Sequence, residues 1–359
     1  MLATIESWPA LLARLLAGRD LTEGEAAWLM GEVIRGDASP ARLAAVLVAL
    51  RAKGESAAEV GGFVAALLRA ATPVPVPGPT LDLAGTGGDG TNAVNLSTMA
   101  AIVAAAAGAR VVKHGGRAAS ATSAGSADVV EHLGVPLDLT PSAHAAVAVE
   151  AGITFVFAAH AHPGMRHASP VRRELGVPTV FNLLGPLINP AGPTHRLVGV
   201  ADGGKVPLVA EVLRGRGASG LVVRGDDGLD KLSTATTSQV WEVREGAIDR
   251  AVLDPAALGI PAPASGALRG GDAAANARVV HEVLAGRPGA VRDAVLLNAA
   301  AGLVAAEPGD GGPLGERLET RYARCAEAID SGAAAATLTR WVKTARARSS
   351  ERRAAGAGV

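Results

Sequence analysis

The sequence is poor in cysteine, in aromatic residues and in net charge. A single cysteine, Cys325, cannot form a disulfide within the chain, which fits a reducing compartment. Aromatic residues make up only 3% of the 359 residues, so the core must be packed largely from Ala, Val and Leu. The 34 basic and 34 acidic residues cancel. With so few aromatic rings, this balance argues against a nucleic-acid groove or a base-stacking surface.

The sequence also lacks the features that direct a chain to a membrane. Its first residues, MLATIESWPALLARLLAG, have neither the cationic start nor the small-residue cleavage site of a signal peptide. The Ala-rich segment 99–107 is far too short to cross a bilayer, and no other apolar run is clearly long enough. We therefore expect a cytoplasmic protein with neither a membrane nor a nucleic acid as partner.

The first part of the chain has helical spacing. Leucine, valine and alanine recur at intervals of three and four from residue 8 to residue 72, and Thr22 with Glu25 forms a capping-box pattern. The next segment, TPVPVPGPT at 72–80, is too rich in proline to continue a helix. These patterns predict a small helical domain over residues 1–72, followed by an extended linker.

Short β-branched runs alternate with Ala- and Leu-rich helical segments from Leu81 onward. The runs are LDLA, RVVKH, ITFVFAA, THRLVGVA and SGLVVRG. Such alternation predicts a large α/β domain over residues 73–345 with a mostly parallel sheet, and we expect residues 346–359 to form a flexible tail. Ligands of such sheets bind beyond the carboxyl ends of the strands.

The loop after the first of these runs, in LDLAGTGGDGTNAVNLST at 81–98, is the strongest local signal. Gly85, Gly87 and Gly90 match a dinucleotide-binding pattern, but no acid for the ribose follows at the required distance. A Walker A loop is excluded because no Gly-Lys-Ser/Thr follows. A loop of free backbone N–H groups remains, leading into a helix that Ser97 or Thr98 caps, which favours an anionic ligand.

Several motifs in the same order resemble the anthranilate phosphoribosyltransferase family of tryptophan biosynthesis. They are GTGGDG with NLST, KHGGR, HPGMRHASPVRRELGVPTVFNLLGPLINPA and GDDGLDKLSTATTS, and the resemblance covers nearly all of the chain. It implies a small N-terminal helical domain plus a large α/β domain with a mostly parallel central sheet, as in pyrimidine nucleoside phosphorylases. Part of the 165–190 hinge segment would join the helical domain, through which the chain would pair as a homodimer.

The resemblance also implies a reaction and a set of site residues. Members transfer the 5-phosphoribosyl group of phosphoribosyl diphosphate to the amine of anthranilate, with Mg²⁺, and release diphosphate. The donor would contact Gly85, Gly88, Asp89, Asn95, Ser97, Thr98, Lys113, Arg117 and Ser120. The acceptor would contact Gly85, Gly116, His114, His162 and Arg172. The metal would lie near Ser97, Asp230 and position 231.

The residue types suit this chemistry independently of the resemblance. Cleavage at the anomeric carbon leaves positive charge on the ribose and negative charge on the diphosphate. Fixed N–H donors, Lys113 and a metal ion can stabilise such charges without an activated nucleophile. Asp226, Asp227 and Asp230 follow the strand LVVRG, where they could hold a hard cation or form a solvated acidic turn.

Two other groups of residues leave alternatives open. His160, His162 and His167 could bind zinc, although the resemblance places HPxxxH beside the acceptor. Arg172 could pair bidentately with an aromatic carboxylate, or else Arg172 or Arg173 could pair with Glu174.

The chain departs from the family at four positions of this site, of which Ala93 and Ala121 are two. Lys231 stands where a glutamate is usual, and Gly116 where an asparagine is usual. A unit-charge pair at 4 Å is worth about 4 kcal/mol at an effective dielectric constant of ~20. We therefore expect that Lys231 either weakens one metal or contacts the diphosphate itself. The alternatives are a relative that uses another aromatic amine in a specialised pathway and a non-catalytic paralogue.

Overall fold

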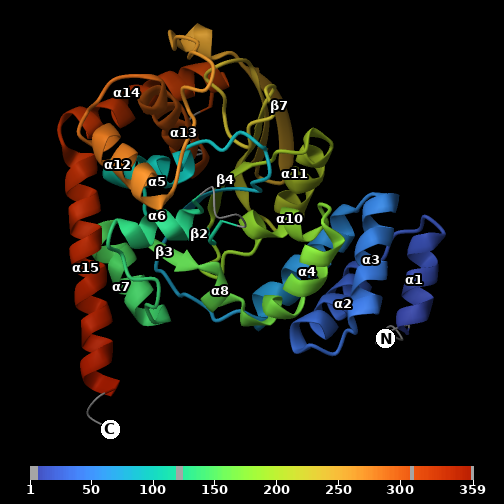
Figure 1. Ribbon diagram of the computed structural model, residues 1–359. Helices are drawn as coiled ribbons and strands as arrows, with labels where there is room; N and C mark the ends of the chain where they lie inside the picture. The colour runs from blue at the N-terminus through green and yellow to red at the C-terminus, as the bar shows by residue number, and fades with distance from the viewer. Residues whose placement is uncertain (1–6, 119–123, 308–310, 357–359) are drawn as a thin grey trace.

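The computed structural model describes residues 7–118, 124–307 and 311–356, which form a helical domain beside a larger α/β domain (Figure 1). The helical domain contains α1 (Trp8–Leu16), α2 (Glu23–Arg35), α3 (Pro40–Lys53) and α4 (Ala57–Ala70). The predicted capping box of α2 is confirmed, because the Glu25 N–H donates to Thr22 Oγ1 at 3.3 Å and the Thr22 N–H donates to Glu25 Oε2 at 2.7 Å. The proline-rich segment 72–80 is irregular, as expected.

Helices α2 and α4 approach each other very closely. A Cβ added to Gly62 of α4 would lie 2.3 Å from the Glu23 carbonyl oxygen and 2.8 Å from the Ala26 Cβ of α2. The neighbouring Gly61 has open space, with its nearest atom, Glu23 Cδ, 4.0 Å away. Gly62 therefore permits the contact on which the helical domain is built.

A seven-stranded sheet, counted over the described residues, runs in the order β3-β2-β1-β4-β5-β6-β7. Its first five strands in this order are parallel, which confirms the predicted mostly parallel sheet. The parallel strands are β1 (Leu81–Gly85), β2 (Val111–Gly115), β3 (Ile153–Phe157), β4 (His195–Gly199) and β5 (Ser219–Gly225). All five of the strand-like runs found in the sequence are strands.

The antiparallel hairpin of β6 (Ser238–Arg244) and β7 (Ala247–Leu253) was not among the expected elements. Its turn is Glu245-Gly246, and both residues have positive φ, 51° and 79°. A two-residue turn of this kind matches the twist of a hairpin. The signal that could have found it is the run QVWEV followed by a Glu-Gly pair and a second extended run.

The two faces of the sheet pack against different layers. Leu197, Leu221 and Val223 belong to a core with α5 (Leu96–Ala106), α13 (Ala290–Ala306) and α14 (Leu314–Asp330). Their chain neighbours Val198 and Val222 belong to a second core, shared with the helical domain and α11 (Val206–Gly215). This follows from the alternation of side chains along a strand.

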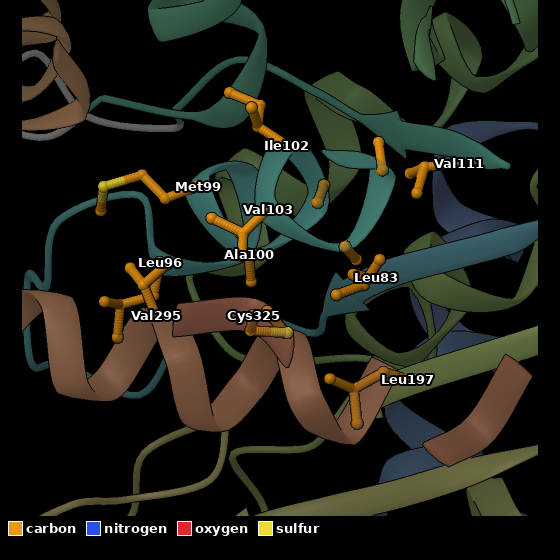
Figure 2. Close-up of a cluster of buried hydrophobic side chains, with 14 of the residues drawn as sticks. Leu83, Leu96, Met99, Ala100, Ile102, Val103, Val111, Leu197, Val295 and Cys325 are labelled. Carbon is orange, nitrogen blue, oxygen red and sulfur yellow. The ribbon is translucent and has the colours of Figure 1, made fainter. Parts of the chain in front are cut away.

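Helix α5 is the central element of the first core. Its residues from Met99 to Ala104 are fully buried, which explains why the sequence here is a nearly unbroken apolar run. Figure 2 shows its side chains between Leu83 of β1 and Val295 of α13. In the same core, Gly302 of α13 comes so close to β1 that an added Cβ would lie 2.9 Å from Leu83 Cδ2. Small residues thus set the thickness of this layer.

The connection from β3 to β4 leaves the sheet and passes along the helical domain. It contains α8 (Ala158–Ala161), η1 (Pro163–His167), α9 (Ser169–Leu175), α10 (Phe181–Leu184) and η2 (Gly185–Leu187). Ala168, Val171 and Phe181 are buried in the same core as the apolar residues of α1 to α4. These contacts describe how the hinge segment packs, while the boundaries of the domains stay a prediction.

The remaining elements also follow the proline-rich segment 72–80 in the chain. They are α6 (Ser126–His132), α7 (Pro141–Ala151), η3 (Gly203–Lys205), η4 (Pro255–Leu258), α12 (Ala273–Leu284) and α15 (Ala333–Gly356). No helix among the described residues combines the length and the apolar character that a bilayer crossing requires.

Helix α15 continues to Gly356 along one edge of the molecule (Figure 1), so residues 346–356 are helical, while the flexibility of the tail over residues 346–359 stays a prediction. Side-chain contacts tie this part of the helix to the rest of the domain. Arg346 Nε donates to the Gly134 carbonyl at 2.9 Å, Arg348 pairs with Glu150, and Ser349 is buried. Residues 357–359 lie outside the described part of the chain.

We predict that Gly62→Ala lowers the free energy of unfolding by about 1–3 kcal/mol, because its Cβ meets backbone that cannot move aside. Gly61→Ala is the matched control and should be neutral or stabilising by up to about 1 kcal/mol, since alanine favours helix and has room. Calorimetric unfolding of both variants checks this. Equal unfolding midpoints for the two variants would contradict the close helix contact.

Candidate functional site

The carboxyl ends of β1, β2 and β4 lie side by side. Strand β1 pairs with β2 on one side and with β4 on the other, and the chain crosses back over the sheet between β3 and β4. This reversal of strand order creates a crevice at the carboxyl ends, where open α/β sheets bind ligands. The glycine-rich loop predicted from the sequence starts at this point, directly after Gly85.

Asp230 occupies the crevice between β1 and β4. A Cβ added to Gly85 would lie 2.2 Å from Asp230 Oδ2, and one added to Gly199 would lie 1.5 Å from the Asp230 carbonyl oxygen. The Gly87 N–H donates to Asp230 Oδ2 at 2.7 Å. The glycines at the two strand ends are therefore required by the position of Asp230.

The glycine loop continues with Gly87, Gly88 and Gly90 at φ of 66°, 75° and 71°, in the left-handed region. It leads into α5, but the expected cap by Ser97 or Thr98 is wrong, because the N-cap residue is Asn95 and its side chain makes no capping bond. Asn95 instead donates to the Ala124 carbonyl at 2.9 Å and accepts from Asn276 at 2.8 Å. The positive end of α5 still faces the crevice.

Lys113, the middle residue of β2, is the main cation of the site. Its ammonium group donates to the Leu83 carbonyl at 2.5 Å and to Ser97 Oγ at 3.2 Å, and the side chain is only 2% exposed. Burial lowers the pKa of Lys113 to about 8, although the nearby carboxylate of Asp82 opposes this shift. The ammonium is thus held between β1 and the first turn of α5.

These residues enclose a cavity of about 290 Å³, which we call the strand-end cavity. Its volume is at the lower end of the range for small-molecule sites. The predicted site residues that line it are Gly85, Asn95, Ser97, Lys113, His114, Gly116, Asp230 and Lys231. Thr98 is buried behind this wall, and its Oγ1 has no hydrogen-bond partner among the described residues.

Lys231 lies between two carboxylates at one edge of this cavity. Its ammonium pairs with Asp230 Oδ1 and lies 4.0 Å from Asp89 Oδ2. Burial alone would lower the pKa of Lys231, but Asp230 and Asp89 outweigh it and raise the pKa. Lys231 is therefore an ammonium ion at neutral pH.

Two histidines stack edge to face on another wall. The rings of His114 and His162 are 5.4 Å apart, His114 Nδ1 is 3.2 Å from the Gly185 carbonyl, and His162 Nε2 is 2.8 Å from the Ile188 carbonyl. Burial, with the neighbouring His162, lowers the pKa of His114 to about 3. His114 is thus neutral at ordinary pH. His114 lines the strand-end cavity, whereas His162 does not line it and packs behind His114.

The other side of the glycine loop faces a second cavity of about 280 Å³, which we call the interdomain cavity. Gly88 and Asp89 line it, together with residues of the helical domain and of the segment 178–183. Ion pairs of Glu55 with Lys205 and of Arg51 with Asp202 connect the two domains at its rim. The glycine loop therefore separates two cavities.

Arg172 lies beside the interdomain cavity without lining either cavity. Its guanidinium is 5.1 Å from the ring of Phe181, which neighbours Asn182 in the cavity wall. Burial alone lowers the pKa of Arg172, and within the described ranges it forms no ion pair, including the one with Glu174 that the sequence leaves open. A partly buried guanidinium without an acid is suited to an anionic ligand.

Other predicted donor residues lie away from the strand-end cavity. Arg117 is 46% exposed at its side chain and pairs with Asp128 and Glu131, at 2.8 Å each, so that its charge is already compensated. Ser120 lies outside the described residues. A donor contact of either residue stays a prediction.

Asp226 and Asp227, unlike Asp230, do not reach the crevice. Asp226 accepts from Thr237 Oγ1 at 2.5 Å, and Asp227 accepts from Ser233 Oγ at 2.7 Å. These two residues form a hydrogen-bonded acidic turn, and metal binding by either of them stays a prediction.

The three clustered histidines contact different neighbours. His160 Nδ1 is 3.2 Å from the Leu137 carbonyl, and its side chain lines a larger, separate cavity of about 590 Å³, whereas His167 packs against Gly36. Within the described part of the chain, no group of three or more His, Cys, Asp or Glu residues could hold a metal ion.

The family models match both parts of the chain. Residues 9–71 match the glycosyl transferase family helical bundle domain, and residues 77–335 match the glycosyl transferase family a/b domain. Together they cover the helical domain, all seven described strands and every later helix up to the start of α15.

Individual relatives agree with these matches. Anthranilate phosphoribosyltransferase of Thermobifida fusca is 55% identical over 345 residues, which are 96% of this chain and 99% of that protein. The crystal structure of the Thermus thermophilus enzyme superposes with a TM-score of 0.86 at 42% identity, covering 93% of this chain and 99% of that one. The structure of the Saccharomyces cerevisiae enzyme in complex with PRPP and Mg superposes with a TM-score of 0.85 at 27% identity, covering 95% of this chain and 98% of that one. The chain therefore belongs to the anthranilate phosphoribosyltransferase family.

Proposed function

We propose that this protein transfers the 5-phosphoribosyl group from phosphoribosyl diphosphate to the amine of anthranilate. The observation that carries the proposal is the strand-end cavity, in which a glycine loop, the start of α5 and the buried Lys113 converge. Relatives more than 50% identical over almost the whole chain have this activity by name. The arrangement supplies what a diphosphate requires, namely N–H donors and cations on rigid strand ends.

The reaction breaks one bond and forms one. The lone pair of the anthranilate nitrogen forms a bond to C1 of the ribose, while the bond from C1 to the diphosphate oxygen breaks and its electron pair leaves with the diphosphate. The nitrogen then loses one proton to solvent. Because charge develops on the diphosphate, a fixed Lys113 ammonium and loop N–H groups stabilise the transition state more than the ground state.

Magnesium would enter with the donor rather than occupy a cage of protein ligands. Mg²⁺ in proteins is commonly held by one or two carboxylates, waters and substrate phosphates. Ser97 and Asp230, which both line the strand-end cavity, are the side chains suited to it, whereas the ammonium of Lys231 opposes a cation at its own position. Bound to the diphosphate, the ion would neutralise part of the leaving-group charge.

The acceptor would lie between the strand-end cavity and Arg172. The neutral ring of His114 and the open space at Gly116 suit an aromatic ring, and the unpaired guanidinium of Arg172 suits the anthranilate carboxylate. In this proposal the amine would face the donor and the carboxylate would stay on the interdomain side.

The helical domain exposes apolar side chains on α1 and α3. Leu16 at the end of α1 is 74% exposed and Val48 on α3 is 48% exposed, and both helices lie at the edge of the molecule away from the sheet (Figure 1). We propose a homodimer through this surface. We also propose a cytoplasmic location. The supporting observation is that Cys325 is free and buried, as expected in a reducing compartment, and cell fractionation would test the location.

We expect the purified protein to consume anthranilate when phosphoribosyl diphosphate and Mg²⁺ are present, measured as loss of anthranilate fluorescence. Omitting the donor is the control and should abolish the change. Consumption of a different aromatic amine, but not of anthranilate, would favour the alternative acceptor. Donor binding without turnover of any amine would indicate a non-catalytic paralogue.

Substitution of Arg172→Gln should raise the KM for anthranilate about 10- to 100-fold, since a hydrogen bond to a charged group contributes about 1.5–3 kcal/mol. The KM for the donor should change little. Arg173→Gln, at the exposed neighbouring position, is the matched control and should leave both values near those of the unaltered protein. Steady-state kinetics that show equal effects for the two variants would refute the assignment.

Introducing charge at the proposed dimer surface, as Leu16→Glu with Val48→Glu, should convert the dimer into a monomer in multi-angle light scattering. Val252→Glu is the control, because Val252 is also exposed, at 63%, but lies on β7 of the other domain. A monomeric unaltered protein would contradict the proposed homodimer.

A further inference from the structure

The carboxylates of Asp89 and Asp230 converge on a cation that belongs to the chain itself. The ammonium of Lys231 pairs with Asp230 Oδ1 and is 4.0 Å from Asp89 Oδ2, although the three side chains come from two loops far apart in the sequence. Two carboxylates that meet beside a phosphate-binding loop are the usual setting for a divalent cation. Here the position between them already holds positive charge.

The remaining oxygens of these two carboxylates also have partners. Asp230 Oδ2 accepts from the Gly87 N–H at 2.7 Å, and Asp89 Oδ1 accepts from the Thr91 N–H and hydroxyl at 3.0 and 2.9 Å. Asp89 Oδ2 is 3.4 Å from the Asp230 N–H. The protein donors thus satisfy both carboxylates, and a divalent ion between them would have to displace the Lys231 ammonium.

Lys231 also lines the strand-end cavity, together with Lys113 of β2. The two ammonium groups are close enough that the charge of Lys231 contributes to the lowered pKa of Lys113. Two cations facing one cavity are suited to the two phosphate groups of a diphosphate. Lys231 retains 18% exposure at its side chain, so a ligand in the cavity can reach it.

The local charge balance depends on Lys231. Lys113 and Lys231 contribute +2 and Asp89 with Asp230 contributes −2, so the sum is zero at this edge. With a glutamate at position 231 the same four groups would sum to −2. A diphosphate could then bind only together with additional metal ions. With Lys231 in place, the cavity needs fewer metal ions to bind the same ligand.

We propose that Lys231 acts as a built-in cation of the donor site, binding the diphosphate directly and taking the place of a divalent ion between Asp89 and Asp230. This proposal rests on the proposed function, because it assigns the ligand of the same cavity. It makes Lys231 a substrate-contacting residue and gives the protein a weak magnesium requirement for binding the diphosphate.

The experiment is calorimetric titration of the full-length protein with inorganic pyrophosphate, first with EDTA and then at increasing Mg²⁺. The unaltered protein should bind pyrophosphate in EDTA within about tenfold of its affinity at saturating Mg²⁺. Lys231→Gln should weaken binding in EDTA about 10- to 100-fold, as expected for loss of a charge-assisted contact. Lys231→Glu should bind measurably only with Mg²⁺ and show a steep dependence on it.

Two controls separate a ligand contact from a structural role. Lys231→Arg keeps the positive charge and should retain binding in EDTA, even if its unfolding midpoint changes. Lys343→Gln and Lys343→Glu make the same changes at a lysine of α15, far from the cavity, and should match the unaltered protein. The same magnesium dependence in the unaltered protein and in Lys231→Glu would overturn the proposal, as would loss of binding in a folded Lys231→Arg.

The outcomes also distinguish this proposal from the proposed function. If pyrophosphate binding follows the expected pattern but anthranilate is not consumed, the acceptor is wrong and the role of Lys231 stands. If anthranilate is consumed but Lys231→Glu binds pyrophosphate with unchanged magnesium dependence, the function stands and the built-in cation is wrong. If the unaltered protein binds no pyrophosphate at any Mg²⁺ concentration, both are wrong.

Discussion

The contact of Asp230 with the ends of β1 and β4 is the constraint on which the site depends. Its carbonyl and carboxylate fill the space that side chains at Gly85 and Gly199 would need, so the loop after β5 is held inside the crevice of the sheet. The bond from the Gly87 N–H to Asp230 then fixes the start of the glycine loop. A late segment of the chain thereby sets the shape of an early one, and the cavity exists only when both are in place.

The charged groups of the site are likewise held in fixed positions by other parts of the chain. Lys113 is buried under the cavity and held by Ser97 and the Leu83 carbonyl, while Lys231 is held by two carboxylates at the rim. Neither ammonium can move far without losing partners that burial makes necessary. The site is thus preorganised for an anion, which is the condition for stabilising charge that develops on a leaving group.

Much of this could be predicted from the sequence, because the relevant signals are local. The parallel strands, the capping box at Thr22, the glycine loop and Lys113 each follow from residue types within a few positions. The rest depends on contacts between distant segments. No local pattern places Asp128 beside Arg117, and none shows that Gly134 and Glu150 hold the last turns of α15. That the N-cap residue Asn95 makes no capping bond could not be predicted, because its side chain accepts instead from Asn276, 181 positions away.

The second hydrophobic core has a consequence for how the protein could evolve. Its members come from α1 to α4, from the segment between β3 and β4, and from the face of the sheet that carries Val198 and Val222. One continuous apolar interior therefore spans both domains. Neither part can be exchanged for a foreign counterpart without rebuilding the other, so we expect the two units to have been inherited together rather than recombined.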